Sequence, residues 1–297
     1  MINKKKPKIK ILVCCHKPDK WLSDDVYMPI QCGKAISNLD LGIQGDDIGE
    51  NISAKNPNYC ELTALYWAWK NLKDVDYIGL CHYRRYFDFK TMGLSVRFIN
   101  ENEIFSCSDL LINNNCLTGK DVILPRSWSL PHSVWTDFLS TVLYQDLYVL
   151  YKVVQKYYPA YLNAFEKYMS GNRRIGYNMF IMRYDIFQSY SEWLFEILNL
   201  TENHIITHSY TSYKRTLAFM GELLLPIYCY ANNLNIGNKR IAFCSDLPSR
   251  KYTYGKKFIK NVLYDTSFFF ERLGNKDALQ QDYWELYLKK DNIFISQ

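Results

Sequence analysis

The order of apolar and polar stretches along the chain predicts strands that alternate with helices. Short apolar runs predict buried strands at residues 8–15, 77–80, 121–124 and 177–182. Helical periodicity predicts helices at residues 56–71, 133–169, 184–198 and 212–230. Pro159 and Pro226 are expected to interrupt the second and fourth of these helices. The alternation favours an α/β sheet with helices packed on it.

The helix that begins near Asn56 carries clear local signals. Asn56 is expected to cap it, with Pro57 at its first position. One apolar face is expected, formed by Leu62, Leu65, Tyr66 and Trp69.

Polar side chains follow two of the predicted strands. His16 and Lys17 follow the first, and the cluster His82, Tyr83, Arg84 and Arg85 follows the strand at 77–80. Ligands of open α/β sheets lie beyond the carboxyl ends of the strands, and adjacent arginines suit phosphate oxygens. We therefore expect a phosphorylated, sugar-like ligand here. The alternatives are a solvated turn at 16–17, a structural role for His82, core packing of Tyr83, and surface ion pairing of the arginines with Asp88.

Composition sets outer bounds on the function. The chain has 297 residues, of which 48% are hydrophobic and 16% aromatic, and a net charge of +6. These values indicate a globular protein, and the aromatics suit a carbohydrate site or reflect an AT-biased genome. The charge fits anionic small molecules, anionic lipid or nucleic acid. The basic start has no apolar region of a signal peptide, and no run is apolar and long enough to predict a transmembrane helix.

Motif content excludes several classes of site. The nine cysteines contain no C-x-x-C pair, which favours reduced thiols in a cytoplasm over disulfides or a zinc site. The chain has neither the glycine-rich dinucleotide fingerprint nor a P-loop. No nucleic-acid-binding signature is present, so we expect no nucleic-acid partner.

The stretch from residue 51 to 87 resembles the signature of a bacterial family. Its members occur as capsular polysaccharide, exopolysaccharide or O-antigen biosynthesis proteins, and the function of their shared domain is unassigned. The similarity is centred on residues 77–80 (YIGL) and 82–87 (HYRRYF). Further matches are residues 51–53, Asn56, Tyr59, residues 61–63, Trp67, residues 69–71, 121–125 and 178–182, Tyr190, and residues 193–195 and 221–224. The resemblance thus covers roughly residues 8–230.

This resemblance implies a glycosyltransferase with a GT-A-like fold, a Rossmann-type mixed sheet flanked by helices. The implied domain spans residues 1–230, and residues 231–297 form a C-terminal extension with a helical part. The implied donor is a UDP-sugar, with galactofuranose or galactose as the expected sugar. The acceptor is expected to be a hydroxyl of a lipid-linked glycan, and the transfer is expected to be inverting.

The cluster at residues 81–85 stands where most GT-A enzymes carry the metal-binding Asp-x-Asp. A diphosphate leaving group requires its negative charge to be neutralised by a metal or by fixed cations. Arg84 and Arg85 can supply such cations, so we expect neither a divalent metal nor another cofactor. Asp74 and Asp76 match Asp-x-Asp but precede the strand, at its wrong end.

Glu222 is the expected catalytic base, with His82 as a second catalytic candidate. An inverting transfer needs a group that takes the proton of the acceptor hydroxyl. Glu222 precedes the apolar run 223–225, where desolvation would raise its pKa. The alternative is a charge at a helix N-terminus. Reserve candidates are His132, Asp137 and Asp185.

Other polar residues are weaker candidates. Asp46 and Asp47 lie in a glycine-bearing loop, where they hold uridine or ribose hydroxyls or simply cap the turn. Glu61 is either a site residue or a surface charge. The expected acceptor or sugar contacts are Glu61, Asn178, His132 and Asp137.

Basic and aromatic residues alternate in the tail from 251 to 297. This composition suits the anionic inner face of the cell membrane, and packing of the aromatics on the core is the alternative. Two other functions stay open at this point: a non-catalytic carbohydrate- or nucleotide-binding module of the same fold, and a nucleic-acid-binding protein.

Overall fold

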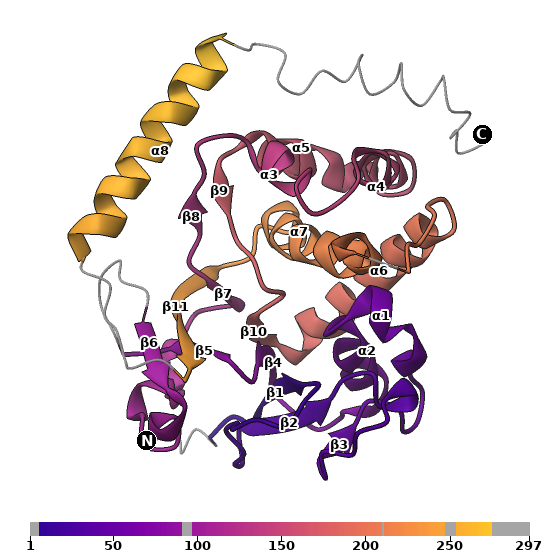
Figure 1. Cartoon of the computed structure of the whole chain (residues 1–297), viewed down its shortest axis with the longest axis vertical. Helices are drawn as coiled ribbons and strands as arrows, with labels where there is room; N and C mark the ends of the chain where they lie inside the picture. The colour runs from indigo at the N-terminus through magenta and orange to yellow at the C-terminus, as the bar shows by residue number, and fades with distance from the viewer. Residues whose placement is uncertain (1–5, 91–96, 210, 247–253, 275–297) are drawn as a thin grey trace.

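The computed structural model describes residues 6–90, 97–209, 211–246 and 254–274 (Figure 1). A central mixed sheet is flanked by helices, as the pattern of the sequence predicted. The strands of the sheet are β1 (Ile9–Cys15), β2 (Tyr27–Gln31), β3 (Gln44–Gly45), β4 (Tyr77–His82), β5 (Arg85–Asp88), β6 (Arg97–Asn100), β7 (Val122–Pro125), β10 (Phe180–Arg183) and β11 (Ile236–Ser245). A separate two-stranded sheet pairs β8 (Trp128–Ser129) with β9 (Arg173–Arg174).

The first part of the sheet is parallel, in the order β3-β2-β1-β4. β10 then pairs antiparallel with both β4 and β7. β11 runs parallel to β7 and β6 and antiparallel to β5. The resemblance implied a domain that ends at residue 230, and no strand was expected after it. The sheet nevertheless takes β11, which lies between β7 and β5, from beyond that point.

The helices lie mainly on one side of the sheet, whereas α8 runs along the outside of the molecule (Figure 1). They are α1 (Asn56–Tyr59), α2 (Leu62–Asn71), α3 (Val134–Phe138), α4 (Tyr144–Tyr157), α5 (Leu162–Ser170), α6 (Tyr184–Glu202), α7 (Thr216–Ala231) and α8 (Tyr254–Gly274). The helical C-terminal part is therefore present as α8. Two other parts of the predicted extension, residues 247–253 and 275–297, lie outside the described residues.

Successive side chains of β1 point to opposite faces of the sheet, and each face is covered by an apolar layer. Leu12 and Cys14 pack into the apolar layer between the sheet and the helices. Ile11 and Val13 pack into a second layer on the other face. Both faces of the strand are buried, which is typical of parallel sheets.

Three details of the helices differ from the prediction. Asn56 does not act as a side-chain cap, because its amide donates to the carbonyl of Cys60 and to Thr63. The expected single helix divides at Cys60, whose φ of 47° is left-handed. Pro226 lies inside α7 without ending it, because the surrounding turns are buried and their packing holds the helix despite the missing N–H.

Candidate active site

The candidate site lies at the edge of the sheet where the parallel strands end. β1 leads into His16, β4 ends at His82, and β7 leads into Trp128. β10 pairs Phe180 with Leu80 in antiparallel register, so the residues before β10 lie at this same edge. The sheet therefore gathers segments that are far apart in the sequence at the position where α/β folds bind ligands.

A tight backbone turn at residues 176–178 forms the centre of this site. Tyr177 and Asn178 have φ angles of 77° and 49°, a left-handed conformation that costs free energy for residues other than glycine. A Cβ atom on Gly176 would lie 2.8 Å from the ring of Trp128 and 3.3 Å from Oε2 of Glu222. The ring of Trp128 and the carboxylate of Glu222 therefore pack directly against the backbone of Gly176.

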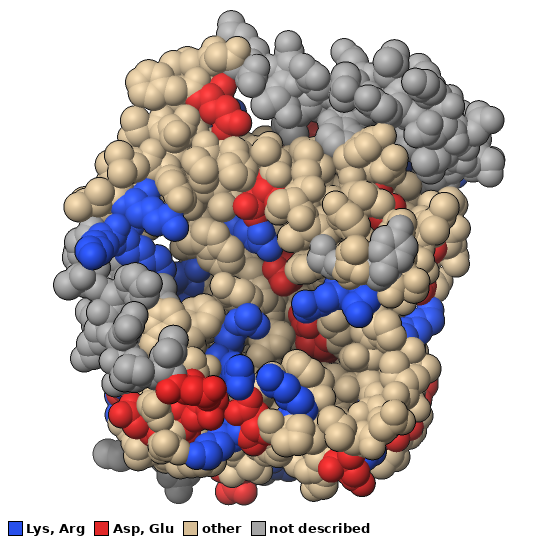
Figure 2. Space-filling view, in the orientation of Figure 1, with Lys and Arg blue, Asp and Glu red and all other residues tan. Residues whose placement is uncertain are grey.

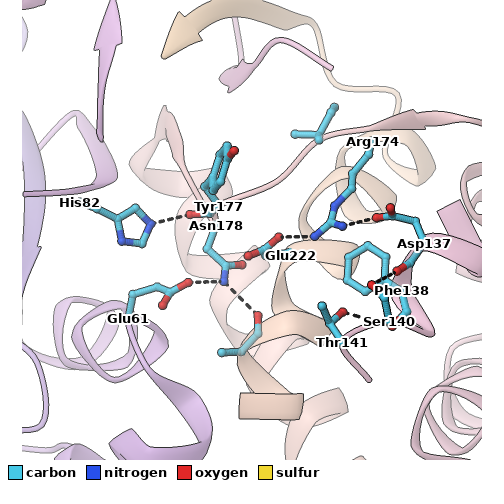
Figure 3. A network of polar contacts seen from close by, with 12 residues as sticks. Glu61, His82, Asp137, Phe138, Ser140, Thr141, Arg174, Tyr177, Asn178 and Glu222 are labelled. Carbon is cyan, nitrogen blue, oxygen red and sulfur yellow. Dashed lines mark hydrogen bonds and ion pairs between the residues drawn. The ribbon is translucent and has the colours of Figure 1, made fainter. Parts of the chain in front are cut away.

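Two buried carboxylates flank this turn (Figure 3). The amide Nδ2 of Asn178 donates to Glu61 Oε1 at 2.7 Å and to the carbonyl of Ala218 at 3.0 Å. Glu222 Oε2 accepts from Arg174 at 3.3 Å. Arg174 also forms an ion pair with Asp137. One network therefore joins Glu61, Asn178, Glu222, Arg174 and Asp137 around the turn, since the backbone at 176–178 connects its two parts.

Glu222 has the electrostatics expected of a proton acceptor. Its side chain is only 12% exposed. Burial raises its pKa above the ordinary value, and Glu61 adds to this rise while Arg174 opposes it. Glu222 is the seventh residue of α7, beyond the first turn. The alternative of a helix N-terminal charge is therefore wrong, because the dipole acts within the first turn.

His82 is held by the same turn. Its Nε2–H donates to the carbonyl of Tyr177 at 2.7 Å, which leaves Nδ1 as the acceptor. Burial lowers the pKa of His82, with Arg85 and Arg215 contributing, against the opposing effects of Glu61 and the Tyr177 carbonyl. These effects favour the neutral form of His82, and the hydrogen bond to the Tyr177 carbonyl fixes the position of its ring.

Arg84 and Arg85 contact different groups. Arg84 Nε donates to Asp19 Oδ2 at 2.8 Å, and its terminal nitrogen lies 3.5 Å from Glu101. Its surface ion pair is thus with Asp19 rather than with Asp88. The Arg85 guanidinium lies 4.7 Å from the ring centre of Tyr177, and its Nε has no hydrogen-bond partner among the residues the structure describes. Arg85 therefore has more capacity left for a ligand than Arg84.

The end of β1 is open to solvent. His16 and Lys17 are exposed, and the His16 ring packs edge-on against Tyr83 with 5.3 Å between ring centres. Tyr83 is buried. Partial loss of solvent around the ring lowers the pKa of His16, and the nearby Lys17, Arg215, His82 and Arg84 lower it further, in that order. These contributions indicate that the cations of this edge lie close to one another.

Asp46 has the geometry of a structural carboxylate. It is fully buried. It accepts from the N–H groups of Gly33 and Lys34 and from the hydroxyls of Ser53 and Thr63, at 2.5–3.0 Å. These four bonds favour the turn-capping alternative over a donor contact. Asp47 is half-buried, so its side chain can reach a ligand.

The remaining candidates fall into two groups. His132 Nε2 lies 3.6 Å from Asp137 Oδ1 and therefore belongs to the network. Asp185 pairs with Arg183, at the end of β10 that meets the start of β4, so it lies at the opposite edge. Asp74 and Asp76 precede β4 at that edge too, as their position in the sequence predicted. Within the described residues, no group of three or more His, Cys, Asp or Glu side chains is placed to hold a metal ion.

A cavity of about 450 Å³ opens beside the turn. Tyr177, Trp128 and Phe243 provide aromatic walls. Its cationic side chains are Arg126, Arg240, Lys256, Lys257 and Lys260. In Figure 2, Lys and Arg side chains surround a hollow beside the lower end of α8. The cavity adjoins Glu222, because Trp128 and Glu222 both lie against Gly176.

Sequence reasoning did not identify Arg174, Trp128, Tyr177 or the cationic walls of this cavity. The one local signal was Gly176 before a tyrosine and an asparagine, a combination that permits left-handed backbone. The cationic residues come from the position after β7, from β11 and from α8, and only the tertiary structure brings these together.

Comparisons with known proteins support the fold and identify the family. The solved apo structure of the WbbM bifunctional glycosyltransferase is similar, with a TM-score of 0.71 and 34% identity. The match covers 80% of this chain and 45% of that one, so the chain spans less than half the length of that protein. The predicted glycosyltransferase-type fold is thereby confirmed. No curated protein sequence matches the chain. A family model described as a domain of unknown function, DUF4422, matches residues 10–233, and the chain belongs to this family.

Proposed function

We propose that this protein is a glycosyltransferase that uses a UDP-sugar, with galactofuranose or galactose as the transferred sugar. The acceptor is a hydroxyl of a lipid-linked glycan in cell-surface polysaccharide synthesis. The observation that carries the proposal is a buried carboxylate, Glu222, at the ligand-binding edge of a fold similar to a known glycosyltransferase. The protein would act in the cytoplasm, at the inner face of the cell membrane.

In the proposed reaction the acceptor oxygen attacks the anomeric carbon of the donor sugar. The bond between that carbon and the diphosphate breaks, and its electron pair leaves with the UDP. Glu222 takes the proton of the acceptor hydroxyl, which its raised pKa favours. His82 and Asn178 position the groups around the reacting carbon. One attack from the opposite face inverts the anomeric configuration.

Cationic side chains would neutralise the diphosphate that leaves. Arg85 is the main candidate, because its Nε lacks a hydrogen-bond partner in the described structure and its planar group suits phosphate oxygens. Arg84, His16, Lys17 and Tyr83 lie at the same edge, and Asp47 would contact the nucleoside. We propose that this charge makes a divalent metal unnecessary. Full transfer in EDTA is the expected result, and loss in EDTA with rescue by Mn²⁺ or Mg²⁺ would contradict it.

A panel of sugar nucleotides tests the function directly. Ligands that bind only the folded state raise the melting temperature, by an amount that grows with concentration over Kd. UDP-galactofuranose and UDP-galactose are expected to stabilise the protein, while GDP- and CMP-sugars are not. Release of UDP in the presence of an acceptor would then demonstrate transfer.

The second candidate is a non-catalytic carbohydrate- or nucleotide-binding module. The short match to a bifunctional enzyme leaves room for it, because this chain covers only 45% of that protein. Stabilisation by a UDP-sugar without hydrolysis or transfer would favour the module. Turnover of the donor would exclude it.

A further inference from the structure

Helix α8 has two faces of opposite character. Seven large apolar side chains point outward, each 46–64% exposed, and all fall within one sector of the helix at about 100° per residue. They are Phe258, Ile259, Val262, Leu263, Phe269, Phe270 and Leu273. Contiguous exposed apolar patches on soluble proteins mark interaction sites.

The less exposed face of α8 is polar apart from Tyr264 and Phe268, and hydrogen bonds tie it to the body of the protein. Asp265 accepts hydrogen bonds from Asn172 at 2.9 Å and from Arg173 at 2.7 Å. Lys257 and Asn261, on this face, line the cavity. The apolar sector therefore faces outward, because Asp265 is bonded to the body at the border of this sector and Lys257 and Asn261 face the cavity from the other side of the helix.

The cavity behind α8 concentrates positive charge. Its lining contains five Lys or Arg side chains and no Asp or Glu among the described residues. Burial lowers the pKa of Lys257, and the nearby charges of Arg240, Lys260 and Arg126 lower it further. A ligand with two or more negative charges would relieve this repulsion.

The two faces meet at Lys256 and Lys260. Both line the cavity and both are exposed. By helical position they border the apolar sector, an arrangement typical of helices that lie in the plane of an anionic membrane surface. No helix among the described residues is long and apolar enough to cross a membrane. One helix thus joins an apolar outer surface to a cationic wall of the cavity.

We propose that the cavity binds the diphosphate head group of an amphiphilic acceptor, while the apolar face of α8 rests on the lipid bilayer that holds this acceptor. This inference rests on the proposed function, because it assigns a binding site to the acceptor of that reaction. The head group would enter past Lys256 and Lys260, and the adjoining Trp128 and Tyr177 would receive its first sugar, near Glu222.

Binding of farnesyl diphosphate, measured by calorimetry on the full chain, tests the cavity. Inorganic pyrophosphate and farnesol serve as probes of the head group and the tail. We expect farnesyl diphosphate to bind, and the double variant Lys257→Gln/Lys260→Gln to weaken it tenfold or more. Lys152→Gln/Lys167→Gln on other helices is the matched control, expected to bind normally. Equal binding by the cavity variant would overturn the proposal, as would equal affinity for farnesol.

Flotation with phosphatidylglycerol vesicles tests the outer face. The wild-type protein is expected to float, and Phe269→Glu/Phe270→Glu to remain at the bottom. Phe105→Glu, at an exposed phenylalanine elsewhere, is the control that should still float. Light scattering that shows a dimer, dispersed by the α8 variant, together with no flotation, would mean that a second copy covers this face and would refute the lipid contact.

The melting-temperature shift with a UDP-sugar separates this inference from the proposed function. If the shift persists while farnesyl diphosphate fails to bind, the acceptor site is wrong and the transferase proposal stands. If no sugar nucleotide shifts the wild-type protein, the transferase proposal itself fails. If the cavity variant abolishes the UDP-sugar shift, the cavity holds the donor and the acceptor assignment is overturned.

Discussion

Replacing Glu222 by glutamine removes the proposed base while keeping nearly the same shape. A general base accelerates a reaction by about 10²- to 10⁴-fold, which corresponds to roughly 3–5 kcal/mol of barrier. The fold should tolerate the change. The amide oxygen of glutamine can still accept from Arg174, which also keeps its ion pair with Asp137. We expect the free energy of unfolding to fall by at most about 2 kcal/mol.

Steady-state transfer as a function of pH provides the assay. Glu222 acts as a base only when ionised, so kcat/KM falls as the pH drops through its pKa. Because burial raises that pKa, this acid limb lies above the pH of an ordinary glutamate. Glu222→Gln should lower the rate of transfer and remove the acid limb of the pH profile. The rise in melting temperature with a UDP-sugar should stay unchanged.

The matched control is Glu61→Gln, which changes the other buried carboxylate of the same network. It is expected to retain the acid limb. Turnover of Glu222→Gln within fivefold of the wild type would refute the assignment of the base. A loss of folding in Glu222→Gln, seen by circular dichroism, would refute the reasoning on stability.

Three further changes test the site. Asp46→Asn should lower the free energy of unfolding, measured in urea, by about 3 kcal/mol. The reason is that an amide nitrogen would then face N–H groups whose hydrogen bonds the carboxylate now accepts. An unchanged urea midpoint would instead favour the alternative that Asp46 contacts a ligand. Gly176→Ala should slow transfer about tenfold to a hundredfold, since the new methyl group displaces Trp128 or Glu222, and normal kinetics would contradict this contact. Arg85→Gln should weaken UDP-sugar binding about tenfold, and more than Arg84→Gln does, because Arg84 is already paired with Asp19; calorimetry showing the reverse order would reverse the assignment.

Local sequence was sufficient for some of the strands and helices and for the edge at which the candidate site lies. The apolar run at 8–15 and the shorter one at 77–80 match β1 and the main part of β4. Strand direction alone then places His16 and His82 at one edge. The break at Cys60 and the division of the long helix at 139–143 were not foreseen, because packing rather than propensity decides them.

The geometry of the site depended on contacts between distant segments. Glu61 and Asn178 are 117 residues apart, and Arg174 and Glu222 are 48 apart. No periodicity predicts such pairs, because they form only when β10 pairs antiparallel with β4 and α7 packs beside them. The sequence by itself determined which residues could form strands, helices and charged strand ends, since those depend on neighbours in the chain. Only the tertiary structure decided which carboxylate is buried, which arginine is already paired and which face of α8 is exposed, because burial and pairing depend on neighbours in space.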